Sequence, residues 1–305
     1  MRILVTGGAG YVGVMLSKAL LEDGHDVTIL DNFMYGYDSV LHLVGYPNLK
    51  IITYDIRNDI ASHVRSNDVI YHLAGISGYP ACESNPSAAQ LTNVVGTENL
   101  IKDLSKNQIL VYASTTSFYG KLGEIMDEES VVEPISIYGQ TKYRAEQIVM
   151  EKDNSIALRL ATIFGVSPRM RLDLLVNDFT YKAVNERCIV LFESKSGRTF
   201  LHIEDAIRAY LLILERIDTM KGEVYNIGSS EMNFNKFEVA ETIKKHTGCT
   251  VLDSPIKDLD RRNFTVSYKK IENIGYKTKF NLDDGVRELV KLYSFYRPLM
   301  PYKPI

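Results

Sequence analysis

Two types of hydrophobic pattern alternate through the first 165 residues. Nearly continuous apolar runs, such as those around Ile29, Ile70 and Val111, alternate with stretches whose apolar positions recur at helical spacing. The expected strands are Arg2–Thr6, Asp26–Asp31, Lys50–Asp55, Asp68–Ala74, Gln108–Ser114 and Ser155–Ala161, and the expected helices lie near residues 11–23, 85–105 and 138–152. Continuous apolar runs are typical of strands buried on both faces. The alternation therefore predicts an α/β fold, a doubly wound parallel sheet covered by helices.

The rhythm becomes irregular beyond Gly165, where the segment 167–171 combines a proline with two arginines. This change predicts a smaller C-terminal lobe that binds substrate. The helix and strand pattern of the first part of the chain returns in an amphipathic run, Glu204–Arg216, and in a strand-like segment, Glu223–Ile227. We therefore expect a discontinuous division. Residues 1–165 form the first lobe, to which 200–228 return, and residues 166–199 and 229–305 form the second.

Composition narrows the possible partners. The chain has 305 residues, of which 45% are hydrophobic, enough to bury a large core. A net charge of −3 offers no general attraction for nucleic acid or for an anionic membrane surface. Cys82, Cys188 and Cys249 are widely spaced and predict neither a disulfide framework nor a metal site. With no signal-peptide pattern before Ile3, we expect a cytoplasmic protein.

A glycine-rich turn joins the first expected strand to the first expected helix. It carries Gly7, Gly10 and Gly13, with Tyr11 and Val12 between the last two. Glycines at this spacing permit a tight turn, close approach of a pyrophosphate and close packing of the helix on the strand. The strand before the turn and the helix after it are the context that this motif requires. The turn predicts a Rossmann-type dinucleotide site, with the phosphates at a helix N-terminus.

Asp31 ends the second expected strand, about 20 residues after the glycine turn, as in dinucleotide-binding chains. Its carboxylate could accept hydrogen bonds from the adenosine ribose and would repel a 2′-phosphate, which favours NAD over NADP. The alternative is a simple polar turn at Asp31-Asn32. Asp55 and Leu73-Ala74-Gly75 follow the third and fourth strands, at the sheet edge where such folds bind ligands.

Tyr138 and Lys142 are four residues apart, so that on a helix both side chains lie on one face. A free tyrosine has a pKa near 10 and is a poor base at neutral pH, but a neighbouring ammonium stabilises its phenolate. The fifth expected strand leads into a cluster of hydroxyl residues that begins with Ser114 and Thr115. One of these hydroxyls could bind the reacting oxygen, or the cluster could be only a polar loop.

Taken together, these motifs resemble the extended short-chain dehydrogenase/reductase family, in particular its NAD-dependent nucleotide-sugar epimerase/dehydratase group. The match runs in family order over about residues 1–230. The matching segments are 6–13, 31–32, 55–57, 72–75, 93–97, 114–115 with 119–120, 138–142 and 198–203.

The resemblance implies roles for individual residues. Tyr138 would be the general base, Lys142 would orient the ribose, and Thr115 would hold the sugar hydroxyl. The cofactor NAD would be bound by Gly7, Gly10, Tyr11, Val12, Gly13, Asp31, Asn32, Asp55, Ile56, Leu73, Ala74, Gly75, Asn93, Tyr138, Lys142 and Ile163. The expected substrate ligands are Thr116, Thr162, Asn177 and Arg198.

Two departures from the family pattern bear on the reaction. Dehydratases of this group carry acidic residues after the catalytic threonine, whereas this chain has Thr116 and Ser117. Elimination of water is therefore disfavoured unless a carboxylate acts from elsewhere, with Glu83 and Glu124 as candidates. Thr162 stands where UDP-hexose 4-epimerases often carry asparagine, which weakens a direct match to those enzymes.

The function expected on these grounds is NAD-dependent oxidation of the C4 hydroxyl of a UDP-, GDP- or dTDP-linked sugar, by a 4-epimerase or a 4-dehydrogenase. A 4,6-dehydratase with displaced acid and base groups and a non-catalytic NAD-binding regulator are the alternatives. We also expect a homodimer, because family members pair through helices that correspond here to residues 85–105 and 138–152. The apolar side chains on the first of these helices are Leu91, Val94, Val95, Leu100, Ile101 and Leu104.

Overall fold

A computed structural model of the chain describes residues 1–119, 125–256 and 265–297. Its centre is a seven-stranded sheet in the order β11-β7-β5-β4-β1-β2-β3, in which every neighbouring pair is parallel. The strands are β1 (Arg2–Thr6), β2 (Asp26–Asp31), β3 (Leu49–Thr53), β4 (Val69–His72), β5 (Ile109–Thr115), β7 (Ser155–Leu160) and β11 (Val224–Ile227). The predicted doubly wound sheet is confirmed.

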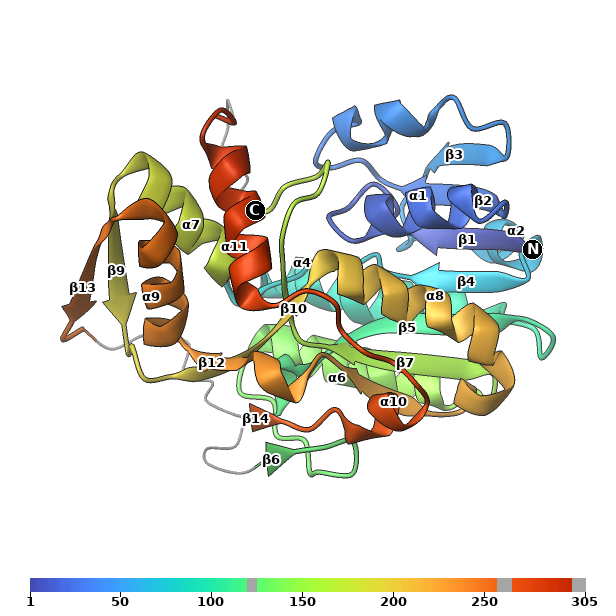
Figure 1. Cartoon of the computed structure of the whole chain (residues 1–305). Helices are drawn as coiled ribbons and strands as arrows, with labels where there is room; N and C mark the ends of the chain where they lie inside the picture. Colours follow the sequence, from blue (N-terminus) through green and yellow to red (C-terminus); the bar gives the residue numbers. More distant parts are fainter. Residues whose placement is uncertain (120–124, 257–264, 298–305) are drawn as a thin grey trace.

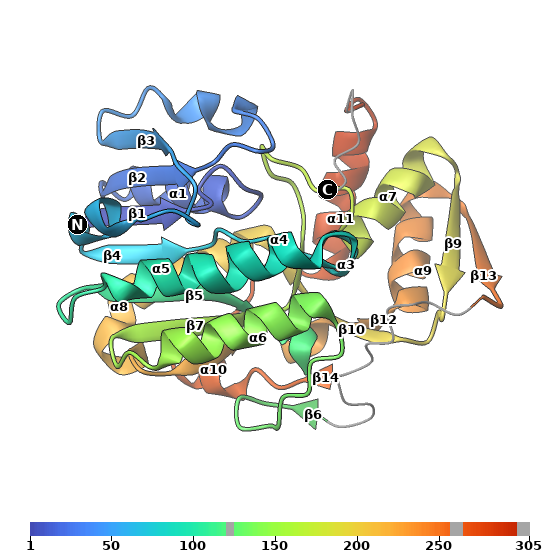
Figure 2. The ribbon, with the colours of Figure 1, turned by 180° about the vertical axis from the view of Figure 1, so that it is seen from behind.

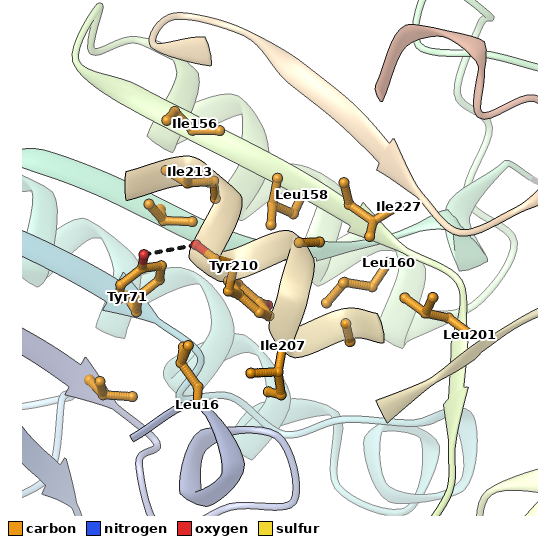
Figure 3. Packing of buried hydrophobic residues seen from close by; sticks show 14 of the residues in the cluster. Leu16, Tyr71, Ile156, Leu158, Leu160, Leu201, Ile207, Tyr210, Ile213 and Ile227 are labelled. Atoms are coloured by element: carbon orange, nitrogen blue, oxygen red, sulfur yellow. Dashed lines mark hydrogen bonds between the residues drawn. The ribbon is translucent and has the colours of Figure 1, made fainter. Parts of the chain in front are cut away.

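Helices cover both faces of this sheet (Figures 1 and 2). On one face α1 (Gly13–Glu22) and α8 (Ile203–Met220) pack with the apolar side chains of the strands in one large core. Tyr210 of α8 lies within this core, where its backbone carbonyl accepts a 2.9 Å hydrogen bond from the Tyr71 hydroxyl (Figure 3). On the other face α2 (Ala61–Arg65), α5 (Gly96–Lys102) and α6 (Ile137–Met150) enclose a second core.

The region expected as one helix over residues 85–105 is divided. It begins as α4 (Pro86–Gln90), widens into one π-helical turn, η2 (Leu91–Val95), and continues as α5. A π-helical turn holds an extra residue, so the side chains after it point in other directions than a regular α-helix would give them. This turn determines where Asn93 points.

A smaller group of elements packs beside the sheet (Figure 1). Helices α7 (Leu175–Asn185), α9 (Lys236–Thr247) and α11 (Leu282–Tyr293) share a core with the parallel pair β9 (Cys188–Phe192) and β13 (Thr250–Ser254). At the junction, β12 (Asn233–Asn235), β10 (Gly197–His202) and β8 (Thr162–Phe164) form a three-stranded sheet. The short elements are η1 (Asp38–Leu43), α3 (Tyr79–Ser84), η3 (Thr116–Phe118), β6 (Ile125–Met126), η4 (Ser230–Met232), β14 (Thr265–Val266) and α10 (Lys269–Asn273).

The chain crosses between the two groups more than once. Strand β11 pairs with β7, as the expected return of residues 200–228 requires. Residues beyond 228 also reach the first group, because Val266, Tyr268 and Ile271 belong to the core between the sheet and α8. The packing thus differs from an assignment of the whole range 229–305 to the second lobe. No helix of the described residues combines the length and apolar character needed to cross a membrane.

Candidate active site

A cavity of about 530 Å³ opens at the carboxyl ends of β1, β4 and β5 and extends to α7, β9 and β10. Ligands of doubly wound folds bind at this edge, because the loops that follow the parallel strands converge there. Among the predicted site residues, the lining includes Gly7, Gly10, Tyr11, Val12, Gly13, Leu73, Gly75, Thr115, Tyr138, Lys142, Thr162, Ile163 and Arg198. Residues from both halves of the chain therefore meet in one cavity.

The glycine turn has the geometry that its sequence predicts. Gly7 has a φ of +70°, a conformation that side chains disfavour. Gly13 begins α1, and a Cβ placed on it would lie 2.1 Å from the carbonyl oxygen of Gly7, which only glycine avoids. The first turn of α1 thus packs directly on the end of β1. The first N–H groups of a helix have no intrahelical partners, and here they lie at Tyr11 and Val12 on the cavity wall.

Asp31 stands at the end of β2 beside this turn. Its carboxylate accepts hydrogen bonds from the backbone N–H groups of Ala9 (3.0 Å) and Phe33 (2.9 Å). Burial raises the pKa of Asp31, and these two bonds oppose the rise. The carboxylate is therefore fixed next to the glycine turn, where an adenosine ribose would lie.

Asp31 and Asn93 lie outside the cavity lining, and so do four further expected cofactor residues. Asn32 donates a 3.3 Å hydrogen bond to Asp55, and Arg57 holds the pKa of Asp55 at about 2 through its hydrogen bonds. Ile56 is buried in the core beneath α5, and Ala74 follows β4, where its N–H contacts the hydroxyl of Thr6. The roles of these residues in cofactor binding stay predictions.

Helix α6 presents Tyr138 and Lys142 to the cavity. Ser136 caps the helix by accepting the N–H of Gly139 at 3.1 Å, which places Tyr138 in the first turn. Lys142 is 7% exposed, and its ammonium lies 4.1 Å from the centre of the Tyr112 ring. Burial lowers the pKa of Lys142 to about 7. An ammonium so poorly solvated interacts strongly with any charge that develops beside it.

Thr115 ends β5 and lines the cavity, and its hydroxyl accepts the N–H of Ser117 at 3.1 Å. Thr116 lies outside the cavity lining. Its side chain is 1% exposed and donates to the carbonyl of Leu160 at 3.2 Å, away from the cavity. Strand β5 ends at Thr115 and the chain enters the 3₁₀ turn η3 at Thr116, and in this turn Ser117 lines the cavity while Thr116 is buried. The substrate contact of Thr116 stays a prediction, and Ser117 is the hydroxyl residue beside Thr115 on the cavity wall.

Asn93 and Asn177 form hydrogen bonds with the backbone of the chain itself. The Asn93 amide accepts the N–H of Ile76 at 2.8 Å and donates to the Ile76 carbonyl at 3.0 Å and to Thr141 at 3.1 Å. The Asn177 amide accepts the N–H of Gly165 at 3.1 Å, and neither asparagine lines the cavity. Both amides hold segments of the wall together, and their contacts with cofactor and substrate stay predictions.

Residues that the motif comparison did not assign also line the cavity. Arg171 is among them, held by Asp173 at 2.5 Å and by the Ser77 hydroxyl at 3.2 Å. Ser77 follows β4, so this contact joins the second lobe to the first sheet. The others at that end include Tyr79, Asp178, Lys182, Val190, Phe192 and Lys236. The basic run around Arg171 was the one sequence signal for this part of the wall.

The lining fits a dinucleotide. Its wall joins the glycine turn, the start of α1 and the buried Lys142 in one cavity large enough for an elongated ligand. Tyr210 also lines it, and within the described part of the chain its fully buried hydroxyl has no hydrogen-bond partner.

Comparison with known proteins decides the family. Residues 3–228 match the model of the NAD dependent epimerase/dehydratase family, which is most of the chain. The chain belongs to this family. It is therefore an enzyme, and its cofactor is NAD, as the glycine turn and Asp31 predicted.

Relatives within the family catalyse several reactions. UDP-glucuronic acid decarboxylase 1 of Xenopus tropicalis is 28% identical over 96% of this chain and 72% of that protein. An uncharacterized UDP-glucose epimerase of Bacillus subtilis is 31% identical over 76% of this chain and 78% of its own length. CDP-paratose 2-epimerase of Salmonella typhi is 27% identical over 95% of this chain and 98% of its own.

Solved structures of the family share the fold. UDP-glucuronic acid 4-epimerase from Bacillus cereus, in complex with UDP-glucuronic acid and NAD, aligns with a TM-score of 0.86 over 96% of this chain and 99% of that one, at 24% identity. A dTDP-glucose 4,6-dehydratase from Bacillus anthracis aligns with a TM-score of 0.84 over 96% of each chain, at 26% identity.

Proposed function

We propose that this enzyme oxidises the C4 hydroxyl of a nucleotide-linked sugar and then either reduces the ketone again, as a 4-epimerase, or releases it, as a 4-dehydrogenase. The observation that carries the proposal is the meeting of Thr115, Tyr138 and Lys142 with Arg198 in one cavity beside the glycine turn. A base, a cation and a hydroxyl are what removal of a proton from an alcohol requires.

Tyr138 takes the proton of the C4 hydroxyl in this mechanism. Bound NAD supplies the hydride acceptor and returns the hydride when the ketone is reduced. Lys142 stabilises the phenolate of Tyr138, since its buried charge acts through a medium of low polarity. Thr115 binds the reacting oxygen from the end of β5. Arg198 is suited to the substrate diphosphate, because its guanidinium can form paired charge-assisted bonds.

Elimination of water is disfavoured by the side chains around Thr115. Ser117 lines the cavity, and a hydroxyl is too weak an acid or base for that step at neutral pH. Asp173 and Asp178 also line it, but ion pairs hold them at 2.5 Å to Arg171 and at 2.7 Å to Lys182. Glu83 is exposed and accepts the N–H of Ile137 at 3.0 Å, and Glu124 lies outside the described residues.

The test is incubation of the purified enzyme with UDP-, GDP- and dTDP-linked hexoses and with UDP-glucuronic acid, a ligand of the similar Bacillus cereus enzyme. Product mass and NADH absorbance are followed. Unchanged mass with altered stereochemistry supports the epimerase, and loss of two hydrogens with NADH formation supports the dehydrogenase. Loss of water contradicts the proposal and supports the alternative function, a dehydratase. Loss of carbon dioxide from a uronate supports oxidation at C4, because a 4-ketouronate is a β-keto acid.

We further propose that the enzyme works as a cytoplasmic homodimer. The cysteines Cys82, Cys188 and Cys249 are free thiols, which suits a reducing compartment. Leu91 supports pairing through the region of α4, η2 and α5, because its side chain is 46% exposed. The support is narrower than the sequence indicated, since Val94, Leu100 and Ile101 are buried within the chain's own core.

A further inference from the structure

A buried carboxylate lies one helical turn beyond Lys142. Glu146 is 3% exposed and occupies the same face of α6, four residues after Lys142. It accepts bonds from the Arg159 guanidinium at 2.8 and 3.2 Å and from the Ser114 hydroxyl at 2.6 Å. Three elements, α6, β5 and β7, therefore hold this carboxylate in the wall behind the cavity.

The guanidinium is fixed in turn from its other side. Arg159 donates to the Tyr119 hydroxyl at 2.7 Å, and that hydroxyl donates to the side chain of Asn226 at 2.8 Å. Arg159 also contacts the backbone carbonyl of Glu128 at 3.2 Å. A buried ion pair is stable only with such additional bonds. Glu146 consequently has one defined position relative to Lys142.

Other titratable groups act on or face the ammonium from neighbouring elements. They include Cys82 of α3, His72 of β4 and Tyr112 of β5. Burial raises the pKa of Cys82 to about 12, lowers that of His72 to about 3 and raises that of Tyr112. All three are uncharged at neutral pH. Among these described neighbours, Glu146 supplies the negative charge that opposes the effect of burial on Lys142.

We propose that Glu146 is the positioning residue that keeps the Lys142 ammonium charged inside the water-poor cavity. The inference rests on the proposed roles of Tyr138 and Lys142. It assigns the ion pair with Arg159 a purpose beyond stability, because the guanidinium holds the carboxylate in place one turn of α6 away from the lysine. Ser114 precedes Thr115 on β5. Its hydroxyl donates to the Glu146 carboxylate, which links that carboxylate to the strand that carries the proposed sugar-binding hydroxyl.

The direct test is the titration of Lys142 itself in protein labelled with ¹³C at the lysine ε-carbon. The Lys142→Arg variant identifies its resonance. In the native protein we expect a midpoint near pH 7. In Glu146→Gln the midpoint should fall by about one pH unit or more, because an opposite charge nearby shifts a pKa by that order. Since turnover requires charged Lys142, the alkaline limb of the kcat/KM profile should move to lower pH as well.

A second variant separates charge from packing. Glu146→Gln alone leaves the Arg159 guanidinium buried without its carboxylate, which destabilises the fold. The double variant Glu146→Gln/Arg159→Met removes that charge too, so its unfolding temperature should recover. Its Lys142 midpoint should lie above that of Glu146→Gln, because the loss of a nearby positive charge raises the pKa of a lysine. A native midpoint in Glu146→Gln would overturn the proposal, because Lys142 would then not depend on the Glu146 charge.

Glu128→Gln is the matched control, because Glu128 belongs to the same network and accepts the N–H of Asn226 at 2.7 Å. It should leave the Lys142 midpoint unchanged. A shift as large as that of Glu146→Gln would mean general loosening of the wall and would also overturn the proposal. The titration needs no turnover, so it is independent of whether the proposed sugar oxidation holds.

Discussion

Tyr138 lines the cavity as the proposed proton acceptor, and removal of its hydroxyl is the clearest test at the level of single residues. We predict that Tyr138→Phe lowers hydride transfer by about 10²–10⁴-fold, because the ring still packs but the proton acceptor is gone. NAD affinity should stay within a few-fold by titration calorimetry. Tyr143→Phe, on the same helix and packed against Phe118, is the control and should turn over normally. Full turnover by Tyr138→Phe would refute the mechanism.

Burial of Lys142 lowers the stability of the folded protein. The unfolded chain binds its proton up to the ordinary pKa of 10.5, whereas the folded protein loses it near pH 7. Burial of Lys142 therefore destabilises the fold most below pH 7, and this cost fades as the pH rises toward 10.5.

We predict that Lys142→Met abolishes turnover yet stabilises the protein by about 1–2 kcal/mol at pH 6, the trade-off found at strained active sites. At pH 10 the gain should be almost absent. Thermal unfolding at the two pH values measures it, with the exposed Lys106→Met as control. Equal gains at both pH values would show that the ammonium is not the source.

Asp31 is the residue that we expect to select between the two nicotinamide cofactors. Its carboxylate is fixed beside the glycine turn by the N–H of Ala9, so a 2′-phosphate would meet a negative charge. We predict that NAD binds at least tenfold more tightly than NADP, about 1.4 kcal/mol. Asp31→Ser should narrow that ratio. Equal affinities for NAD and NADP in the native enzyme would show that this carboxylate does not select between the two cofactors.

At the level of elements, the contact of α1 with β1 admits no side chain at Gly13. A methyl group there would lie 2.1 Å from the Gly7 carbonyl oxygen, so Gly13→Ala must push the helix off the strand. We predict a loss of NAD affinity of about tenfold or more and a lower unfolding temperature. Gly45→Ala is the control, because nothing lies within 4 Å of its added Cβ. Normal NAD binding by Gly13→Ala would show that the helix start does not hold the cofactor.

The sequence was sufficient for elements with strong local patterns. The six expected strands lie within one or two residues of β1, β2, β3, β4, β5 and β7, because buried parallel strands are nearly continuous apolar runs. The π-helical turn at Leu91–Val95 was not predictable from a period of 3.6 residues, and it is this turn that brings Asn93 to Ile76. The 3₁₀ turn that begins at Thr116 was not expected from the strand pattern either, and Thr116 is buried in it.

Contacts between distant segments account for the rest of the site. Arg171 meets Ser77 across 94 residues of sequence, and Glu146 meets Arg159 and Ser114 from three different elements. No local sequence pattern predicts these contacts between distant residues. They follow from the crossing of the chain between the two groups of elements, which only the assembled fold defines.

At the scale of the whole molecule, the proposed dimer would depend on a small apolar area. We predict that sedimentation at micromolar concentration gives a dimer and that Leu91→Asp gives a monomer, since the side chain is 46% exposed on η2. Leu41→Asp is the control, because Leu41 is 58% exposed on η1, far along the chain. A native protein that sediments as a monomer would contradict the proposed assembly.

The pairing of β11 with β7 has a consequence for how the chain is made. Strand β7 is complete at Leu160, but its neighbour β11 begins only at Val224. A ribosome adds about 5–20 residues per second, so the nascent chain presents the unpaired edge of β7 for several seconds. Unpaired edges attract other strands. The time between these two segments is thus the interval in which a newly synthesised copy is most exposed to aggregation, and slower translation would lengthen it.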